Sequence, residues 1–434
     1  MSTGTEVSVN IRSLAVGGAG VGEVTAQTDG RSDLLGITAF VPYSAIGEQV
    51  AARVVQRKER YIQTELLSVT VASEQRVPPP CKLFTMCGGC ELQHITYEQQ
   101  LKAKYEMIYG ALRAAKLPMR LLERLHPVVA GRELGYRRRV SLHIDQSGKV
   151  GFYREASRSV VATDHCPVAV APINEVLKNI AEFGHEVRGK ISSLLLEADS
   201  EGVVAVLKTP YALAASEARA MMDIAKKYFP SALLFAGEKE VSGYGRQILE
   251  LPLNDRGTLT LRVPAGYFSQ VNAEINARLV NRAIELANPT KNDLIGDLYA
   301  GAGNFSLPFA RTGAKVTAVE CDKRLVGVGR ENATRYNLQK NLEFVELSVE
   351  KFLQRKPRPV FDIALCDPPR SGLGNLVPLL SEMKKIVLVS CHLPSFVRDA
   401  KNLCEHGWEA DTIVPFDMFA QTSYVEILAV FNRS

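Results

Sequence analysis

Long hydrophobic runs are absent from this sequence. No stretch approaches the roughly 18 uninterrupted apolar residues that a membrane-spanning helix needs, so no segment is expected to cross a bilayer. The first 20 residues lack a basic region followed by an apolar core and a small-residue cleavage site, and a secretory signal is therefore not expected. Low-complexity segments and internal repeats are also missing. These absences predict a cytoplasmic protein without a membrane partner.

The charge balance excludes little. Lys and Arg number 52 against 47 Asp and Glu, which leaves a formal net charge of +5. Such a mild excess permits a polyanionic partner without requiring one. Hydrophobic residues make up 46% of the 434 residues, which is ordinary globular usage and allows about three domains at roughly 150 residues each.

The pattern of residues along the chain predicts three domains. Short β-rich runs with glycine turns fill residues 1–70 and predict a small OB-like β-barrel, a fold that often binds oligonucleotides. Residues 71–262 mix strands and helices and are expected to form a central α+β domain, which includes an amphipathic helix over 97–117. Strands alternate with helices in residues 263–434, which predicts a parallel α/β sheet.

A glycine turn follows the first strand of this α/β region. The sequence Asp297-Leu-Tyr-Ala-Gly-Ala-Gly-Asn-Phe305 lets the backbone approach a ligand closely. Ser306 stands where a dinucleotide fingerprint would have its third glycine, so NAD is disfavoured. Glu320 ends the next strand, where an acid can accept hydrogen bonds from ribose hydroxyls. The combination suits an adenosine cofactor without a pyrophosphate, such as S-adenosylmethionine.

A proline loop follows another strand. The sequence Asp367-Pro-Pro-Arg370 lies at the carboxyl end of its strand, where open α/β sheets bind ligands. Two prolines stiffen the loop and hold Asp367 toward that crevice. Enzymes that methylate exocyclic amines usually have an aromatic residue after the prolines, whereas this chain has arginine, so amine methylation is disfavoured.

A thiol and an acid complete the candidate site. Cys391 follows the strand Ile386–Ser390 at the same sheet edge. A thiolate beside a methyl donor can add to carbon 6 of uracil and make carbon 5 nucleophilic, and a base must then remove the carbon 5 proton. Glu426, in the terminal strand, is the candidate base.

Four further cysteines form a candidate metal site. Cys81, Cys87 and Cys90 share a short loop, and Cys166 precedes a proline. Four thiolates suit zinc and iron–sulfur clusters alike, so the spacing leaves the choice open, and a set of disulfides is the less favoured alternative in a reducing compartment. The remaining three, Cys321, Cys366 and Cys404, are expected to pack in the core.

Taken together, these motifs resemble the RNA uracil-5-methyltransferase family, specifically its 23S ribosomal RNA branch, over nearly the whole chain. The matching segments are Phe268–Asn272, Asp297–Phe305, Val319-Glu320, Asp367–Arg370, Val389–Cys391 and Tyr424–Glu426.

The resemblance implies a Rossmann-like class I methyltransferase domain, an N-terminal TRAM-type barrel and a [4Fe-4S] cluster rather than zinc. Cys391 would be the nucleophile and Glu426 the general base. The implied S-adenosylmethionine contacts are Gln270, Tyr299, Asn304, Glu320 and Asp367, and the implied cluster ligands are Cys81, Cys87, Cys90 and Cys166. The substrate would be a uridine of 23S ribosomal RNA flipped out of a folded loop, gripped by the barrel and the arginines of residues 132–139.

One departure and two alternatives remain. His392-Leu393 replaces the Asn-Pro that the family usually has after the nucleophile, which leaves the conformation of that loop open, although His392 could donate in place of the asparagine amide. The same reaction on a transfer RNA is the first alternative, and a catalytically inactive RNA-binding protein is the second. A monomer without a protein partner is expected in each case.

Overall fold

A computed structural model describes residues 4–254 and 257–433, which divide into two compact units. Of the described residues, the first unit comprises 4–108, 152–161 and 419–424, and the second holds the rest. No helix within the described ranges is both long enough and apolar enough to cross a membrane.

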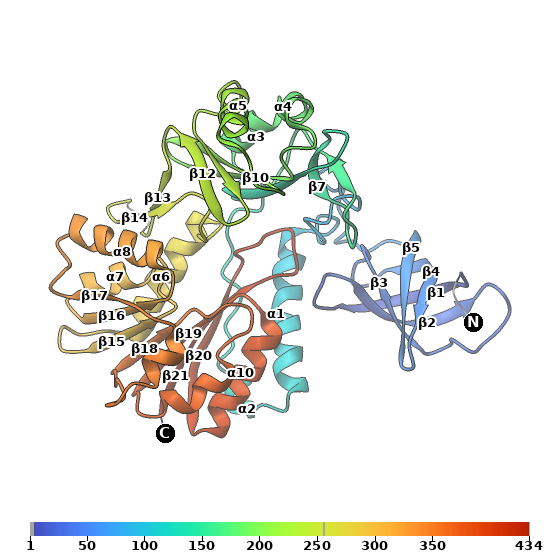
Figure 1. Ribbon diagram of the computed structural model, residues 1–434. Coiled ribbons are helices and arrows are strands. Elements are labelled where there is room, and N and C mark those ends of the chain that lie inside the picture. Colours follow the sequence, from blue (N-terminus) through green and yellow to red (C-terminus); the bar gives the residue numbers. More distant parts are fainter. Residues whose placement is uncertain (1–3, 255–256, 434) are drawn as a thin grey trace. The chain divides into compact units, whose positions relative to one another are not determined.

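A closed β-barrel begins the first unit (Figure 1). Its strands alternate buried and exposed side chains, which turns one face of each strand toward the barrel interior. Val7, Val9, Val50 and Ile62 are among the residues that fill that interior. In barrel order the strands are β1 (Glu6–Leu14), β2 (Gly20–Gln27), β3 (Thr38–Val41), β5 (Tyr61–Val71) and β4 (Gln49–Arg57). The barrel expected from the sequence is confirmed.

Helix α1 (Tyr97–Ala114) follows the loop that carries Cys81, Cys87 and Cys90, which we call the cysteine loop. It ends three residues earlier than the sequence predicts, because Lys116 takes a left-handed backbone conformation with φ of 57° just before Leu117 and Pro118. A short helix, α2 (Met119–Leu122), comes next in the second unit.

A seven-stranded sheet lies mostly in the second unit, with residues 152–161 of its last two strands assigned to the first, and three helices are grouped on one side of it in Figure 1. The strands, in spatial order, are β12 (Lys239–Tyr244), β11 (Ala232–Ala236), β10 (Gly202–Thr209), β9 (Ser193–Asp199), β6 (Arg139–Ile144), β7 (Val150–Tyr153) and β8 (Val160–Ala162). The helices are α3 (Ala171–Leu177), α4 (Ile180–Val187) and α5 (Ala215–Ala225). A separate hairpin pairs β13 (Ile248–Pro252) with β14 (Thr260–Pro264).

The second seven-stranded sheet carries the motifs of residues 263–434. Its spatial order is β17 (Leu342–Glu346), β16 (Lys315–Glu320), β15 (Leu294–Leu298), β18 (Ile363–Cys366), β19 (Lys385–Ser390), β21 (Glu426–Arg433) and β20 (Trp408–Phe416). The first five strands run parallel, and β21 is antiparallel to both of its neighbours. The accompanying helices are α6 (Ala273–Ala287), α7 (Ser306–Arg311), α8 (Lys323–Arg335), α9 (Val349–Leu353), the 3-10 helix η1 (Gly374–Leu380) and α10 (Leu393–Glu405).

This arrangement confirms the expected α/β methyltransferase-type fold. The order of the strands changes direction at β15. The next two strands in the chain, β16 and β17, are added on one side of β15, and the later strands, from β18 onward, are added on its other side. Open α/β sheets bind ligands at such a switch point, outside the carboxyl ends of the strands.

Candidate active site

Five reactive side chains lie at one edge of the second sheet. Asp297, Glu320, Asp367 and Cys391 stand at or just beyond the carboxyl ends of β15, β16, β18 and β19. Glu426 is the first residue of β21, and because β21 runs antiparallel to β19, its start meets the end of β19. We call these five residues the strand-end cluster. The sequence predicted this shared edge for Asp297, Asp367 and Cys391, and the sheet order places Glu320 and Glu426 there too.

The glycine turn and Glu320 form one hydrogen-bonded frame. Tyr299 and Gly301 take positive φ angles of 71° and 56°, which bend the chain sharply after β15. The backbone N–H of Gly301 donates to one Glu320 carboxylate oxygen over 3.0 Å. The other oxygen accepts from the N–H groups of Cys321 and Asp322 over 2.7 and 2.8 Å. The acid is therefore held rigidly beside the turn, with lone pairs left for a ligand's hydroxyls.

Asp297 and Asp367 are buried acids that suit a cationic ligand. Asp297 is only 2% exposed, and burial raises its pKa to about 7 although Ser306 donates a hydrogen bond to it. Its Oδ1 atom is buried and has no hydrogen-bond partner within the described part of the chain. Burial and the charge of Asp297 raise the pKa of Asp367 as well. An ammonium or sulfonium group would stabilise both carboxylates, and S-adenosylmethionine carries both kinds of cation.

Two other predicted cofactor residues are held by neighbours. The Asn304 and Asn276 side-chain amides exchange two hydrogen bonds, of 2.9 and 3.1 Å. The backbone carbonyl of Gln270 accepts a 2.7 Å hydrogen bond from Nε of Arg138. This bond does not use the side-chain amide of Gln270. The structure thus brings Gln270 into an ordered loop but ties the Asn304 amide to α6.

The arginines of residues 132–139 differ from the expectation that they grip RNA as a group. Arg138 is only 5% exposed, and it also donates to Ser269 over 2.6 Å. Arg139 is paired with Glu197 over 2.8 Å. Arg138 is therefore committed inside the protein and the expectation is wrong for it, whereas Arg139 is paired but partly exposed. Arg132 is exposed and makes a 3.4 Å ion pair with Glu274, so it stays accessible.

The thiol of Cys391 is half-buried and its pKa is raised to about 11. The causes are burial and the negative charges of Glu426 and Asp367, which the positive charge of Arg370 opposes. Glu426 is 1% exposed, and burial together with Asp367 raises its pKa well above the ordinary value. The charges of Glu426 and Asp367 thus act on the Cys391 thiol, and the charge of Asp367 acts on Glu426.

The loop after Cys391 is held by hydrogen bonds despite its departure from the family pattern. His392 is the N-terminal cap of α10, and its Nδ1 atom lies 2.8 Å from Oγ of Ser395. That Oγ donates its single proton to the Arg370 carbonyl over 2.5 Å, so Nδ1 of His392 must be the donor to Ser395. His392 therefore takes a donor's role, and the relay fastens the proline loop to α10.

Asp399 is a site residue that sequence reasoning missed. It is 2% exposed on α10, and its carboxylate accepts from the backbone N–H groups of Leu373 and Gly374 over 2.6 and 3.2 Å. These bonds hold the far end of the loop that begins at Asp367. Its partners lie 26 and 25 residues away in the sequence, so no local pattern reveals this role.

The cysteines outside the strand-end cluster differ in their surroundings. Cys366 is fully buried, which confirms its place in the core. Cys321 is exposed, so the prediction of a core cysteine is wrong there, because β16 ends one residue earlier. Cys404 is half-buried.

The four candidate metal ligands are all half-buried. Cys81, Cys87 and Cys90 belong to the first unit and Cys166 to the second. Within residues 4–254 and 257–433 no group of three or more His, Cys, Asp or Glu side chains is gathered as it would be around a metal.

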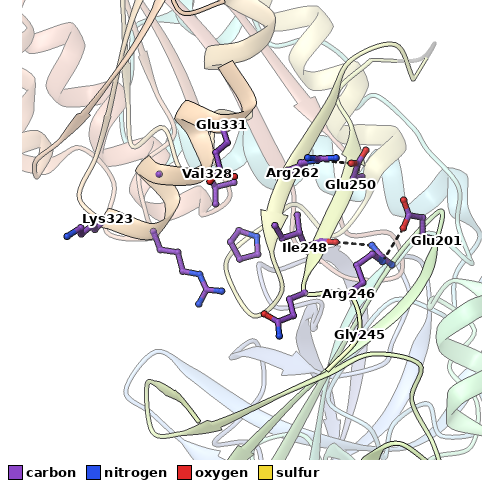
Figure 2. A pocket seen from close by; sticks show the side chains of 13 residues that line it. Glu201, Gly245, Arg246, Ile248, Glu250, Arg262, Lys323, Val328 and Glu331 are labelled. Carbon is purple, nitrogen blue, oxygen red and sulfur yellow. Dashed lines mark hydrogen bonds and ion pairs between the residues drawn. The ribbon is translucent and has the colours of Figure 1, made fainter. Parts of the chain in front are cut away.

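A pocket of about 980 Å³ lies away from this chemistry, between the β13–β14 hairpin, the turn from β9 to β10 and α8 (Figure 2). None of its lining residues belongs to the strand-end cluster. Arg246 is paired there with Asp199, and Arg262 with Glu250 over 2.8 Å. Lys323 and Arg324 of α8 also line the pocket.

Comparisons with known proteins agree with this geometry. The family model described as tRNA (Uracil-5-)-methyltransferase matches residues 244–433. The 23S rRNA (uracil(1939)-C(5))-methyltransferase RlmD of Shewanella sediminis is 33% identical over 413 residues, covering 92% of this chain and 91% of the relative. The protein of the same name from a Marinomonas species is 31% identical, covering 94% and 93%.

The fold comparison extends over almost the whole chain. The crystal structure of a Pyrococcus abyssi tRNA (uracil-54, C5)-methyltransferase in complex with S-adenosyl-L-homocysteine has a TM-score of 0.74 and 24% sequence identity, and it covers 98% of this chain and 99% of that one. At this identity the likeness speaks for the fold. From the strand-end cluster and the full-length relatives together, the chain belongs to the RNA uracil-5-methyltransferase family and is an S-adenosylmethionine-dependent enzyme.

Proposed function

We propose that the protein methylates carbon 5 of a uridine in 23S ribosomal RNA. The observation that carries the proposal is the meeting of Cys391 and Glu426 at adjacent ends of β19 and β21, beside Asp367. The curated relatives from Shewanella and Marinomonas, named for a 23S rRNA uracil, support the substrate class.

In this proposal the Cys391 thiolate adds to carbon 6 of the uracil, and the carbon 5–carbon 6 electron pair becomes available for attack from carbon 5. Bound S-adenosylmethionine would supply the methyl group. Glu426 then takes the carbon 5 proton while the sulfur–carbon 6 bond breaks, which restores the double bond and the free cysteine. An acid whose pKa is raised is a stronger proton acceptor than an ordinary surface glutamate.

For the cofactor, Glu320 would accept the ribose hydroxyls, and Asp297 and Asp367 would face its cationic groups. Gln270 and the turn at Tyr299 would line the same crevice. Asn304 would line it as well, with its side chain held by the hydrogen bonds to Asn276. Carbon 5 of a uracil is accessible only when the base leaves its stack, so the target uridine would be flipped out of a folded loop.

We further propose that Cys81, Cys87, Cys90 and Cys166 bind a [4Fe-4S] cluster with a structural role. Support comes from the family and from the chemistry of four half-buried thiols, which as thiolates are the ligands that iron–sulfur clusters use. Iron and sulfide analysis of protein purified without oxygen, with Cys87→Ser as the comparison, tests this. Zinc in place of iron, or a metal content that Cys87→Ser leaves unchanged, would overturn it.

The substrate is tested by mapping 5-methyluridine by mass spectrometry in ribosomal and transfer RNA from cells with and without the gene. Loss of one 23S position that wild-type protein restores and Cys391→Ala does not is the expected result. A loss confined to transfer RNA would favour the substrate class of the Pyrococcus neighbour instead, and unchanged RNA would support an inactive RNA-binding protein.

A further inference from the structure

The segment that leads into the proposed base belongs to the first unit. Residues 419–424 are grouped with the barrel and the cysteine loop, whereas Val425 and the residues after it belong to the second unit. Glu426 therefore follows this segment after a single intervening residue. A change in residues 419–424 would therefore reach the start of β21 through Val425.

Gln421 is held by several hydrogen bonds. It has a left-handed backbone with φ of 69°, which a non-glycine residue adopts only when its surroundings determine it. Its carbonyl accepts from the backbone N–H groups of Glu91 and Leu92, both over 3.1 Å. These two residues come directly after Cys90, so the segment is bonded to the end of the cysteine loop.

Gln100 of α1 completes the attachment. Its side chain exchanges two hydrogen bonds with Gln421: Nε2 donates to the side-chain oxygen over 3.0 Å, and Oε1 accepts from the backbone N–H over 3.1 Å. The same Nε2 lies within hydrogen-bond distance of the carbonyls of Leu92 and Ile95. Gln100 is 1% and Gln421 3% exposed, so loss of these bonds would leave buried polar groups unpaired.

Further bonds run on both sides of Gln421. The Glu91 carboxylate accepts from the N–H of Ser423 over 3.0 Å. The hydroxyl of Ser423 accepts from the N–H of Gly17 over 3.1 Å, and the ammonium of Lys104 donates to the Phe419 carbonyl over 3.1 Å. Barrel, cysteine-loop flank and helix thus hold the segment at three successive points.

We propose that Gln100 and Glu91 are positioning residues for Glu426, because they hold the segment from which the base enters the active site. The proposal rests on the function proposed above for Glu426. It also gives the cysteine loop a part in the reaction that needs no electron transfer. If that loop lost its structure, Gln421 would lose its hydrogen bonds to Glu91 and Leu92, and Glu426 would be displaced.

The reaction order makes this role separable from a general loss of structure. Glu426 acts only after Cys391 has added and the methyl group has moved, so a misplaced base should slow release of the covalent adduct and leave its formation intact. A displacement of about 1 Å can cost on the order of 100-fold in rate. A smaller displacement than about 1 Å should cost less, so we expect Gln100→Leu to slow adduct release by at least about 10-fold.

The experiment follows a single turnover of the full-length protein with S-adenosylmethionine and a 23S RNA fragment, quenched at intervals and separated on denaturing gels. Gln99→Leu removes the same amide from the neighbouring position of α1 and is the matched control. Gln421→Gly is the second variant, because glycine accepts the left-handed backbone while the side-chain bond is lost. Both Gln100→Leu and Gln421→Gly should accumulate adduct that Gln99→Leu does not.

The outcomes separate this inference from the proposed function. Adduct release in Gln100→Leu and Gln421→Gly at the rate of Gln99→Leu would overturn the positioning role while leaving the mechanism in place. Equal slowing of adduct formation and release would also overturn it, since that indicates a structural defect. Continued methylation by Cys391→Ala would instead refute the proposed mechanism itself.

Discussion

Ser390 and Ile427 lie opposite each other in the antiparallel ladder of β19 and β21. The next residue along β19 is Cys391, and the residue before Ile427 is Glu426. One register therefore places the proposed nucleophile and the proposed base at neighbouring strand ends. A shift of this pairing by one residue would turn Glu426 to the opposite face of the sheet.

The buried acids predict a pH dependence of cofactor binding. Asp297 has a pKa of about 7, and that of Asp367 is raised as well, so both carboxyls are largely protonated below neutrality. A cationic ligand favours the ionised forms, and binding of S-adenosylmethionine should tighten as the pH rises through about 7. Calorimetry across that range checks this, with Asp297→Asn expected to flatten the profile. A pH-independent affinity of the wild type would contradict the assignment.

The charges around Cys391 predict how fast its thiol is alkylated. Burial, Glu426 and Asp367 raise its pKa to about 11, and Arg370 lowers it. Arg370→Ala should therefore slow the reaction with iodoacetamide at neutral pH, because less thiolate is present. Peptide mass spectrometry measures the rate, and the half-buried Cys404 of the same protein is the internal control. An unchanged or faster rate at Cys391 alone would show that Arg370 does not act on the thiol.

The relay from His392 through Ser395 to the Arg370 carbonyl predicts which substitutions are tolerated. His392→Asn keeps a side-chain donor and should keep most of the activity, whereas His392→Leu should lower kcat by about 10-fold because the proline loop loses its attachment. Ser395→Thr should likewise be tolerated and Ser395→Ala should not. Steady-state kinetics check this, with KM for S-adenosylmethionine as the readout of general damage. If the leucine and asparagine variants behave alike, the relay has no role in the reaction.

Arg138 is predicted to contribute to stability rather than to RNA affinity. Arg138→Met would leave the Gln270 carbonyl and the Ser269 hydroxyl without their donor, at a cost of about 1–3 kcal/mol in the free energy of unfolding. Arg132→Met, at an exposed position, should change it by less than about 0.5 kcal/mol. Urea unfolding compares the two. A stable Arg138→Met protein with weakened RNA binding would restore the original expectation for this residue.

Much of the site could be predicted because it lies where regular elements end. The strands Leu294–Leu298 and Lys315–Glu320 are short apolar runs with clear boundaries, and Asp367 and Cys391 follow two more. Parallel strands bring such ends to one edge regardless of the residues between them, so local pattern was enough.

The residues that support the site could not be predicted in this way. Asp399 and Gln100 act through backbone groups far away in sequence, which no spacing reveals. The arginine run at residues 137–139 reads as a charged surface, yet Arg138 is buried against a loop more than 130 positions away. Hydrogen bonds between distant parts of the chain set the positions of these side chains, and sequence periodicity carries no information about such bonds.

Glu426→Gln offers the most direct test of the central claim. The amide cannot take the carbon 5 proton, so proton-transfer catalysis worth about 10²- to 10⁴-fold is lost while addition and methyl transfer continue. Incubation with S-adenosylmethionine and a 23S RNA fragment should trap a methylated RNA joined to the protein, and peptide mapping should place the bond on Cys391. Full turnover without an adduct, or an adduct on another cysteine, would contradict the account.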